Sequence, residues 1–211
     1  MRTIAKSILI MAAAAAGCLA QQWEFGGSGG VGFLNSVSVA TPQASATAGF
    51  QTGAAFGAFF GQNLYSHFSG EAHYGFFESN LKLSSGGQTV SFSGNAHVLH
   101  YDFVAHTNRE SRTQFFAAVG GGMKIFDGTG QEEAYQPLSQ FGYFTQTHSI
   151  KPMADFGGGI RYALTAHLSL RVEFRDYLTP FPTAVLTPAP GAKFGSILND
   201  IVPMVGLSYQ Y

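Results

Sequence analysis

Apolar and polar residues alternate without a break along residues 168–175, which read LSLRVEFR. A period of two predicts a β-strand whose two faces differ. Three consecutive glycines at 157–159 precede this strand, so its long side chains are expected beside a segment almost without side chains. The apolar face would carry Leu168, Leu170, Val172 and Phe174, and the other face Ser169, Arg171, Glu173 and Arg175.

The same alternation continues through most of the chain and predicts eight strands. In each strand one parity is rich in aromatic and aliphatic residues, as with Phe115, Val119 and Ile125 in the fifth. Strands with one apolar face could form a closed barrel or a sandwich of two sheets. The expected strands are residues 22–33, 49–60, 67–78, 92–105, 113–126, 153–163, 167–178 and 200–211.

The connections between these strands alternate in length, which favours the barrel. Long segments rich in Gly, Pro, Ser, Gln and Thr follow the odd strands, and short segments follow the even ones. With an even number of strands, all long loops lie at one end and both termini at the other, as in transmembrane barrels. The long segments are 34–48, 79–91, 127–152 and 179–199, and the short ones are 61–66, 106–112 and 164–166.

The remaining residues of the strands support the same architecture. The polar parity is rich in Gly, Ala and Ser, which suits a narrow interior, and a closed barrel leaves no strand edge in lipid. We therefore predict an all-β protein, an eight-stranded antiparallel up-and-down transmembrane β-barrel. Aromatic residues near strand ends are expected to form girdles at the membrane interfaces; these are Trp23, Tyr65, Tyr177, Tyr209 and Tyr211.

The polar parity carries most of the charges of the strands, and in a barrel this parity faces the lumen. An eight-stranded barrel is just wide enough to be filled by side chains, and buried charges need partners. We expect a structural network that closes the lumen. Its predicted members are Glu24, Glu71, His73, His100, Asp102, Lys124, Asp155, Arg161, Arg171, Glu173 and Arg175.

A turn near Thr165 predicts the register between the sixth and seventh strands. Asp155 would face Arg175, while Gly157 and Gly159 would face Glu173 and Arg171 and leave space for these long side chains.

A second register would bring two histidines together. If residues of the third and fourth strands pair with numbers that add up to about 173, Glu71 faces Asp102 and His73 faces His100. Such a cluster could bind zinc or gate the lumen through protonation. Alternatively, the histidines could hydrogen-bond to arginines across the barrel, and we predict no metal site.

Composition narrows the class of protein further. Only 11% of the 211 residues are charged, against about 25% in ordinary soluble domains, and the chain has 27 glycines and 20 phenylalanines. The net charge of −1 gives no electrostatic basis for binding nucleic acid. A mean hydropathy of +0.09 is too polar for a bundle of membrane helices.

The N-terminus has the layout of a secretory signal peptide, with Arg2 and Lys6 before an apolar stretch and a small-residue site near Ala20. We expect residues 1–20 to be the signal peptide and residues 21–211 to be the barrel domain. The segment before Cys18, the only cysteine, loosely resembles a lipoprotein cleavage site, which is an alternative.

Three stretches carry a resemblance to a known family: FFAAVGGGMKIF (115–126), DFGGGIRYALTAHLSLRVEFRDYL (155–178) and VGLSYQY (205–211). With them, essentially the whole mature chain resembles the small outer-membrane barrels of the OmpA/OmpX-like superfamily. The resemblance implies a bacterial outer-membrane location and contact with outer-membrane lipid and lipopolysaccharide. It also implies insertion by the barrel-assembly machinery, for which Leu207, Tyr209 and Tyr211 look like the C-terminal signal.

The superfamily includes adhesins, structural proteins and a few lipid enzymes, so the resemblance does not fix the function. No spacing of Ser, His and an acidic residue stands out as a nucleophilic triad. The GxGxxG match at 27–32 lacks the context of a nucleotide loop. We predict no catalytic residues and no cofactor. The expected role is structural or interactive, with the four long outer loops contacting an unknown extracellular partner. A narrow passive pore and a lipid-A-modifying enzyme are the alternatives.

Overall fold

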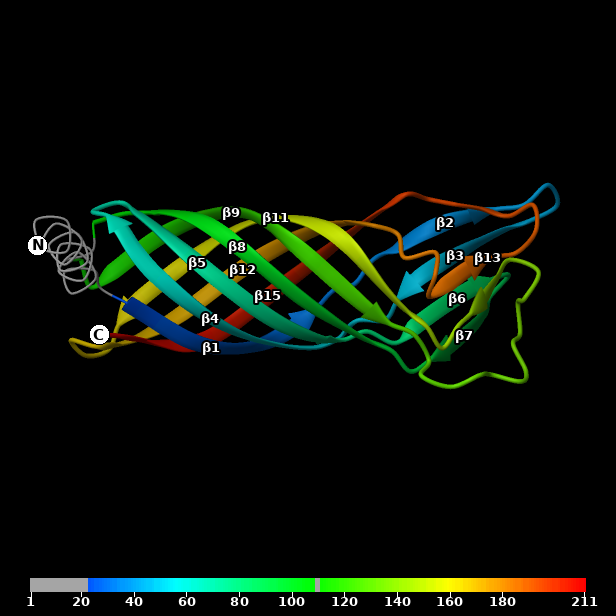
Figure 1. Cartoon of the computed structure of the whole chain (residues 1–211), viewed down its shortest axis with the longest axis horizontal. Helices are drawn as coiled ribbons and strands as arrows, with labels where there is room; N and C mark the ends of the chain where they lie inside the picture. Colours follow the sequence, from blue (N-terminus) through cyan, green and yellow to red (C-terminus); the bar gives the residue numbers. More distant parts are fainter. Residues whose placement is uncertain (1–22, 109–110) are drawn as a thin grey trace, which may run out of the picture.

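The computed structural model describes residues 23–108 and 111–211, so the predicted signal peptide and Cys18 lie outside the described residues. Within those two ranges, eight long strands form a closed antiparallel barrel in the order β1-β15-β12-β11-β9-β8-β5-β4 (Figure 1). Within the described ranges, no helix is long and apolar enough to cross a membrane. The predicted all-β class and eight-stranded barrel are confirmed.

The barrel strands lie close to the predicted positions. Strand β1 pairs with β15 and closes the barrel, and β1 begins at the same end at which β15 ends (Figure 1). The strands are β1 (Trp23–Gly32), β4 (Gly53–Tyr65), β5 (Phe68–Glu78), β8 (Asn95–His106), β9 (Thr113–Asp127), β11 (His148–Ala163), β12 (Leu168–Pro180) and β15 (Ile197–Gln210).

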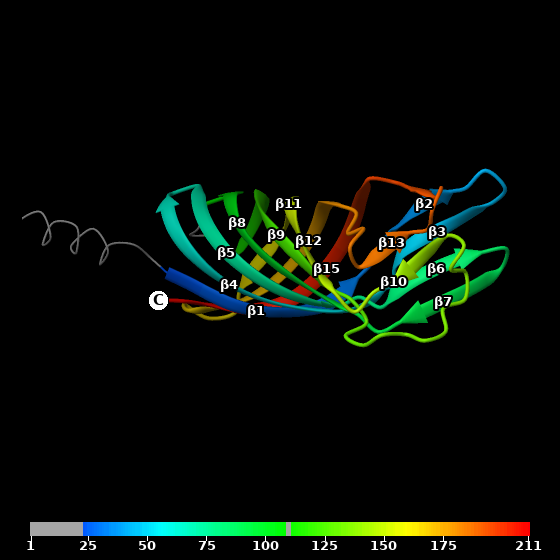
Figure 2. The ribbon, with the colours of Figure 1, turned by 45° about the vertical axis from the view of Figure 1, so that its right-hand side comes forward.

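The long connections are more ordered than the sequence analysis foresaw, because they contain short strands that it did not predict. Beyond one end of the barrel they form a five-stranded sheet in the order β14-β2-β3-β6-β7 and a two-stranded sheet of β10 and β13 (Figure 2). These short strands are β2 (Ser36–Ala40), β3 (Ser45–Phe50), β6 (Leu81–Ser85), β7 (Gln88–Phe92), β10 (Gly142–Phe144), β13 (Leu186–Pro188) and β14 (Lys193–Phe194).

Burial of alternate residues explains why these connections fold. In β2 and β6, Val37, Val39, Leu81 and Leu83 point inward with at most 7% of their surface exposed. A glycine pair turns the chain between β6 and β7, where Gly86 and Gly87 both have positive φ, as tight hairpins require. The resulting apolar core continues into the adjoining half of the barrel, where it includes Phe77, Val98, Phe126, Val202 and Met204.

The outer wall of the barrel is apolar, as the alternation predicted. On the expected parity, large apolar side chains remain exposed because their face is turned away from the lumen; they include Phe25, Phe56, Phe103, Phe115, Val119, Phe156, Val172, Phe174 and Val205, which are 45–64% exposed.

Most of the expected interfacial aromatics fit this arrangement, but one does not. Tyr65, Tyr209 and Tyr211 are exposed near the end of the barrel that carries the short turns. Tyr177 is only 2% exposed and lies inside. It shares the inward parity of Arg175, so its position near a strand end was a misleading signal.

The register between β11 and β12 differs from the prediction by two positions. Gly157 pairs with Arg175, and Gly159 pairs with Glu173, because the last pair is Ala163 with Ser169. The intervening turn spans residues 164–167, and the Oγ of Thr165 accepts hydrogen bonds from the backbone of His167 and Leu168. The predicted turn, 164–166, was too short. A shift of two keeps every side chain on its predicted face.

Candidate functional site

Arg171, on β12, lies at the centre of the barrel interior with 1% of its surface exposed. Its Nη1 and Nη2 donate to both carboxylate oxygens of Glu71 over 3.1 and 2.7 Å, and its Nε donates to Glu173 over 3.0 Å. The rings of Phe59 and Phe116 contact its guanidinium, with centroids 4.3 and 4.4 Å from Cζ. The side chain is therefore held by a bidentate ion pair and by aromatic faces.

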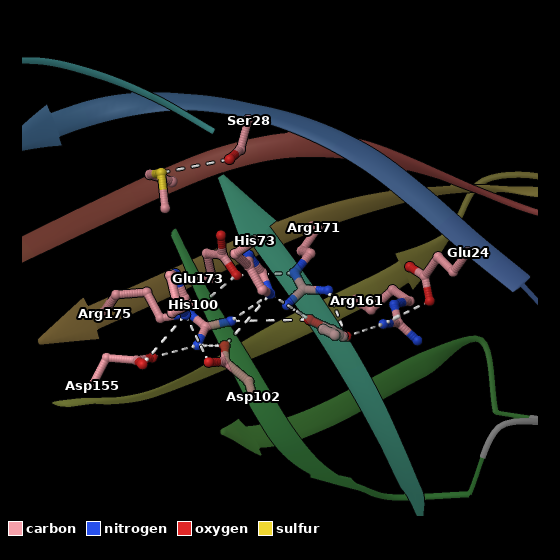
Figure 3. A network of polar contacts seen from close by, with 12 residues as sticks. Glu24, Ser28, His73, His100, Asp102, Asp155, Arg161, Arg171, Glu173 and Arg175 are labelled. Carbon is pink, nitrogen blue, oxygen red and sulfur yellow. Dashed lines mark hydrogen bonds and ion pairs between the residues drawn. The ribbon is translucent and has the colours of Figure 1, made fainter. Parts of the chain in front are cut away.

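Arg175 lies four residues further along β12, on the same face, and is fully buried. Its Nη1 donates to Asp102 of β8 and, over 3.0 Å, to Asp155 of β11. Its Nη2 lies 3.2 Å from His73 Nε2, and its Nε lies 3.6 Å from Glu173 Oε2. Figure 3 shows these side chains converging from several strands into one continuous network.

The two histidines meet as the second predicted register requires, because His73 pairs with His100 and Glu71 with Asp102. Their rings stack with centroids 4.8 Å apart. His100 Nδ1 lies 2.7 Å from Asp102 Oδ1 and 3.3 Å from Asp155 Oδ1, and His73 Nε2 lies 3.0 Å from Glu71 Oε2. Each imidazole therefore contacts carboxylates as well as its stacked neighbour.

The same geometry bears on the zinc alternative. Ligand atoms of His73, His100 and Asp102 lie within 4.8 Å of one another, which a metal could bridge. The guanidinium of Arg175 contacts both Asp102 and His73. Two of the three candidate ligands thus already have a buried cation as a partner, which favours the hydrogen-bonding alternative over a metal site.

At the end with the short turns, Arg161 of β11 extends the network. Its Nη2 lies 2.9 Å from Glu24 Oε2, and its Nη1 donates to Gln114 over 3.2 Å. All three side chains are buried. Because Arg161 Nη2 also lies 3.6 Å from Glu71 Oε1, this pair is linked to the Arg171 pair.

A separate ion pair lies towards the end of the barrel from which the five-stranded and two-stranded sheets extend. Lys124 of β9 donates to Asp200 of β15 over 2.7 Å, and both are fully buried. The ammonium lies 5.1 and 5.0 Å from the ring centroids of Phe77 and Phe126. Lys124 is therefore the point at which the polar lumen meets the apolar core.

The glycines of β11 allow the backbone of β12 to approach closely and leave space for Arg175 and a phenylalanine. A Cβ built on Gly157 would lie 2.2 Å from the Phe174 carbonyl oxygen and 2.9 Å from Arg175 Cδ, and one built on Gly159 would lie 2.1 Å from the Val172 carbonyl oxygen and 2.8 Å from Phe116 Cζ. Beside the network, a hollow of only about 10 Å³ remains between Ser28 and Tyr177, enough for about one water molecule. Side chains therefore fill the lumen at this level.

The structure places all the predicted network residues inside the barrel, each with at most 7% of its surface exposed. The sequence prediction did not include five inward neighbours, although their parity on the strands could have identified them. These neighbours are Phe59, Gln114, Phe116, Tyr177 and Asp200.

The residues of the predicted assembly signal lie on the other side of the wall. Leu207 and Tyr209 project outward from β15 and are 49% and 38% exposed. Tyr211 follows the last strand residue, is 86% exposed, and its backbone N–H donates to the carbonyl of Trp23 over 2.9 Å. The final residue thus still belongs to the seam between β15 and β1.

Comparison with solved structures agrees with this architecture. The chain is similar to Neisserial surface protein A (NspA), at 9% identity and a TM-score of 0.50 over 90% of this chain and 97% of that one. It is also similar to the outer membrane protein OprG from Pseudomonas aeruginosa, at 13% identity and a TM-score of 0.59 over 89% and 95% of the two chains. The chain has the fold of the small outer-membrane β-barrels. No protein-family model and no curated protein matches the sequence.

Proposed function

We propose that this protein is a non-enzymatic barrel of the bacterial outer membrane that presents a folded outer platform to an extracellular partner. The observation that carries the proposal is the division of the molecule into an apolar outer wall, a lumen closed by ion pairs and an ordered outer sheet. A closed lumen leaves the outer surface as the part of the protein able to contact other molecules.

The apolar belt has the dimensions of a membrane barrel. Asn95, the first residue of β8, and Thr107, which directly follows β8, are polar residues of the outward parity, and eleven residues separate them. A transmembrane strand needs about 9–11 residues. At the outer edge of the belt, Glu78, Asn95, Asp127 and His148 pair in one row across β5, β8, β9 and β11. Outer-membrane lipid would cover the belt below this row, with lipopolysaccharide in contact at the row itself.

The outer sheet supplies a specific candidate surface. Its inward face is apolar, whereas its outward face carries a row of hydroxyl side chains in register, namely Ser38, Thr47, Ser84 and Thr89. Ser84 and Thr89 hydrogen-bond to each other over 2.9 Å. This face is held by a buried core, so a partner would meet a preformed surface.

The first test concerns the lumen. Purified protein in planar bilayers should give little or no steady conductance, because the network fills the passage. A porin measured in the same bilayers provides the positive control. Large, stable channels would instead support the pore alternative.

The alternative that the protein is a lipid-A-modifying enzyme is tested by the chemistry of lipid A. Mass spectra of lipid A from cells with and without the gene should be identical if the protein is not an enzyme. A change in acyl number that depends on the gene would overturn the non-enzymatic proposal.

A further prediction concerns insertion by the barrel-assembly machinery. Deletion of Tyr211 should reduce the amount of heat-modifiable barrel in outer membranes while export continues, because it removes the aromatic residue that follows β15 and a hydrogen bond of the seam between β15 and β1. The matched control is Tyr135→Ala, since Tyr135 is 80% exposed in the outer region. Equal folded yields of the deletion and the control would contradict the assembly role.

A further inference from the structure

The hollow of about 10 Å³ beside the lumen network has an unusual lining. Glu173, Tyr177 and the two stacked histidines line it from the network, and Ser28 and Met204 line it from β1 and β15. The Ser28 hydroxyl lies 3.5 Å from the Met204 sulfur, apart from the ion pairs (Figure 3). Polar groups of several strands therefore surround a space of the size of one small molecule.

Tyr177 contributes a buried hydroxyl to this lining. The side chain is 2% exposed, and its ring centroid lies 5.5 Å from that of Phe77 and 5.6 Å from that of His100. These contacts hold the ring but do not involve the hydroxyl, which makes no hydrogen bond within residues 23–108 and 111–211. A buried tyrosine hydroxyl normally has a partner, so this group points to a ligand in the hollow.

The two histidines contribute one ring nitrogen each. His100 Nδ1 lies 2.7 Å from Asp102 and 3.3 Å from Asp155, and His73 Nε2 lies 3.0 Å from Glu71. An ionised carboxylate only accepts hydrogen bonds, so these two nitrogens carry the hydrogens. In a neutral ring the opposite nitrogen is then an acceptor. The opposite nitrogens, His73 Nδ1 and His100 Nε2, have no hydrogen-bond partner in the described part of the chain.

We propose that the hollow binds one water molecule as a permanent part of the lumen. The water accepts a hydrogen bond from the Tyr177 hydroxyl and donates to the unpaired nitrogens of His73 and His100. It joins β5, β8 and β12 at the level of the network. This site goes beyond the proposed surface function and does not depend on it.

Size and chemistry both favour water over other ligands. A volume of about 10 Å³ corresponds to about one water-sized sphere, and a hollow with two to four polar partners holds water, whereas an apolar one stays dry. A metal cation fits less well, because Glu173 is the one carboxylate in the lining and already accepts a hydrogen bond from Arg171 over 3.0 Å.

Crystal structures of the mature chain, at a resolution that shows ordered water, test the site. The wild type should show one density peak about 2.5–3.0 Å from the Tyr177 hydroxyl oxygen. Gly57→Ala should lose the peak, because Gly57 lines the hollow and a Cβ there would lie 3.1 Å from Ser28 Oγ and 3.6 Å from Met204 Sδ. The matched control is Gly27→Ala, whose Cβ would meet only the Gly57 carbonyl oxygen, 3.7 Å away on the outer wall, and should retain the peak.

Tyr177→Phe separates the hydroxyl from the shape of the hollow. The variant keeps the ring and removes one partner of the water, so most of the peak should disappear. The heat-modifiable band shows first that each variant is folded, and Tyr177→Phe decides the matter if Gly57→Ala does not fold. A wild-type hollow without density would overturn the proposal, as would an unchanged peak in Tyr177→Phe. Contacts of about 2.3–2.6 Å would identify a cation such as calcium and would overturn it too.

Discussion

Replacement of Arg171 by Met should lower the free energy of unfolding by about 3–5 kcal/mol. The variant leaves the carboxylates of Glu71 and Glu173 buried without the guanidinium that now binds both. Met retains much of the side-chain volume, so the cost reports the lost charge rather than a large cavity. Urea titration of the folded barrel in vesicles measures the change.

The exposed Arg112 provides the control for Arg171. Arg112→Met should change the free energy of unfolding by about 0.5 kcal/mol or less, because surface substitutions rarely cost more. The double variant Arg171→Met with Glu71→Gln should recover part of the loss, since it removes one of the unpaired charges. Equal stabilities of the Arg171 and Arg112 variants would contradict a buried, closed network.

Val172→Arg should lower the free energy of unfolding by about 2–4 kcal/mol, because it places a charge near the middle of the lipid belt. Val172 is 45% exposed and lies midway between Leu168 and Asp176 on the outward parity of β12. Leu168→Arg, next to the turn, should cost less because the longer side chain can reach the interface. Urea titration in vesicles compares the two variants, and a larger loss for Leu168→Arg would show that the belt is misplaced.

Alternation along the sequence predicted the barrel and its two faces because a strand has only two sides. The shift of two positions between β11 and β12 left each residue on its predicted face and changed only its neighbours. Parity is therefore a stronger sequence signal than register, which here depended on the hydrogen bonds of the turn around Thr165.

The short-stranded sheets and the partners of some network residues could not be predicted in the same way. Strands such as β13 and β14 are two or three residues long, too short for a period to be recognised. Asp200 lies at the beginning of the expected last strand, and only the structure brings it to Lys124. Tyr177 could have been assigned to the lumen from parity, but its position near the strand end favoured the membrane interface.

A scan of single cysteines at positions 168–175 tests the central claim most directly, because Cys18 is the only native cysteine. Each mature single-cysteine protein is labelled with a fluorophore, inserted into vesicles and exposed to lipid-soluble quenchers. Labels at the even positions Leu168, Leu170, Val172 and Phe174 should be quenched, and labels at the odd positions should not. Quenching that is uniform, or strongest at Arg171 and Glu173, would contradict a barrel with an apolar outer wall and a charged, closed lumen.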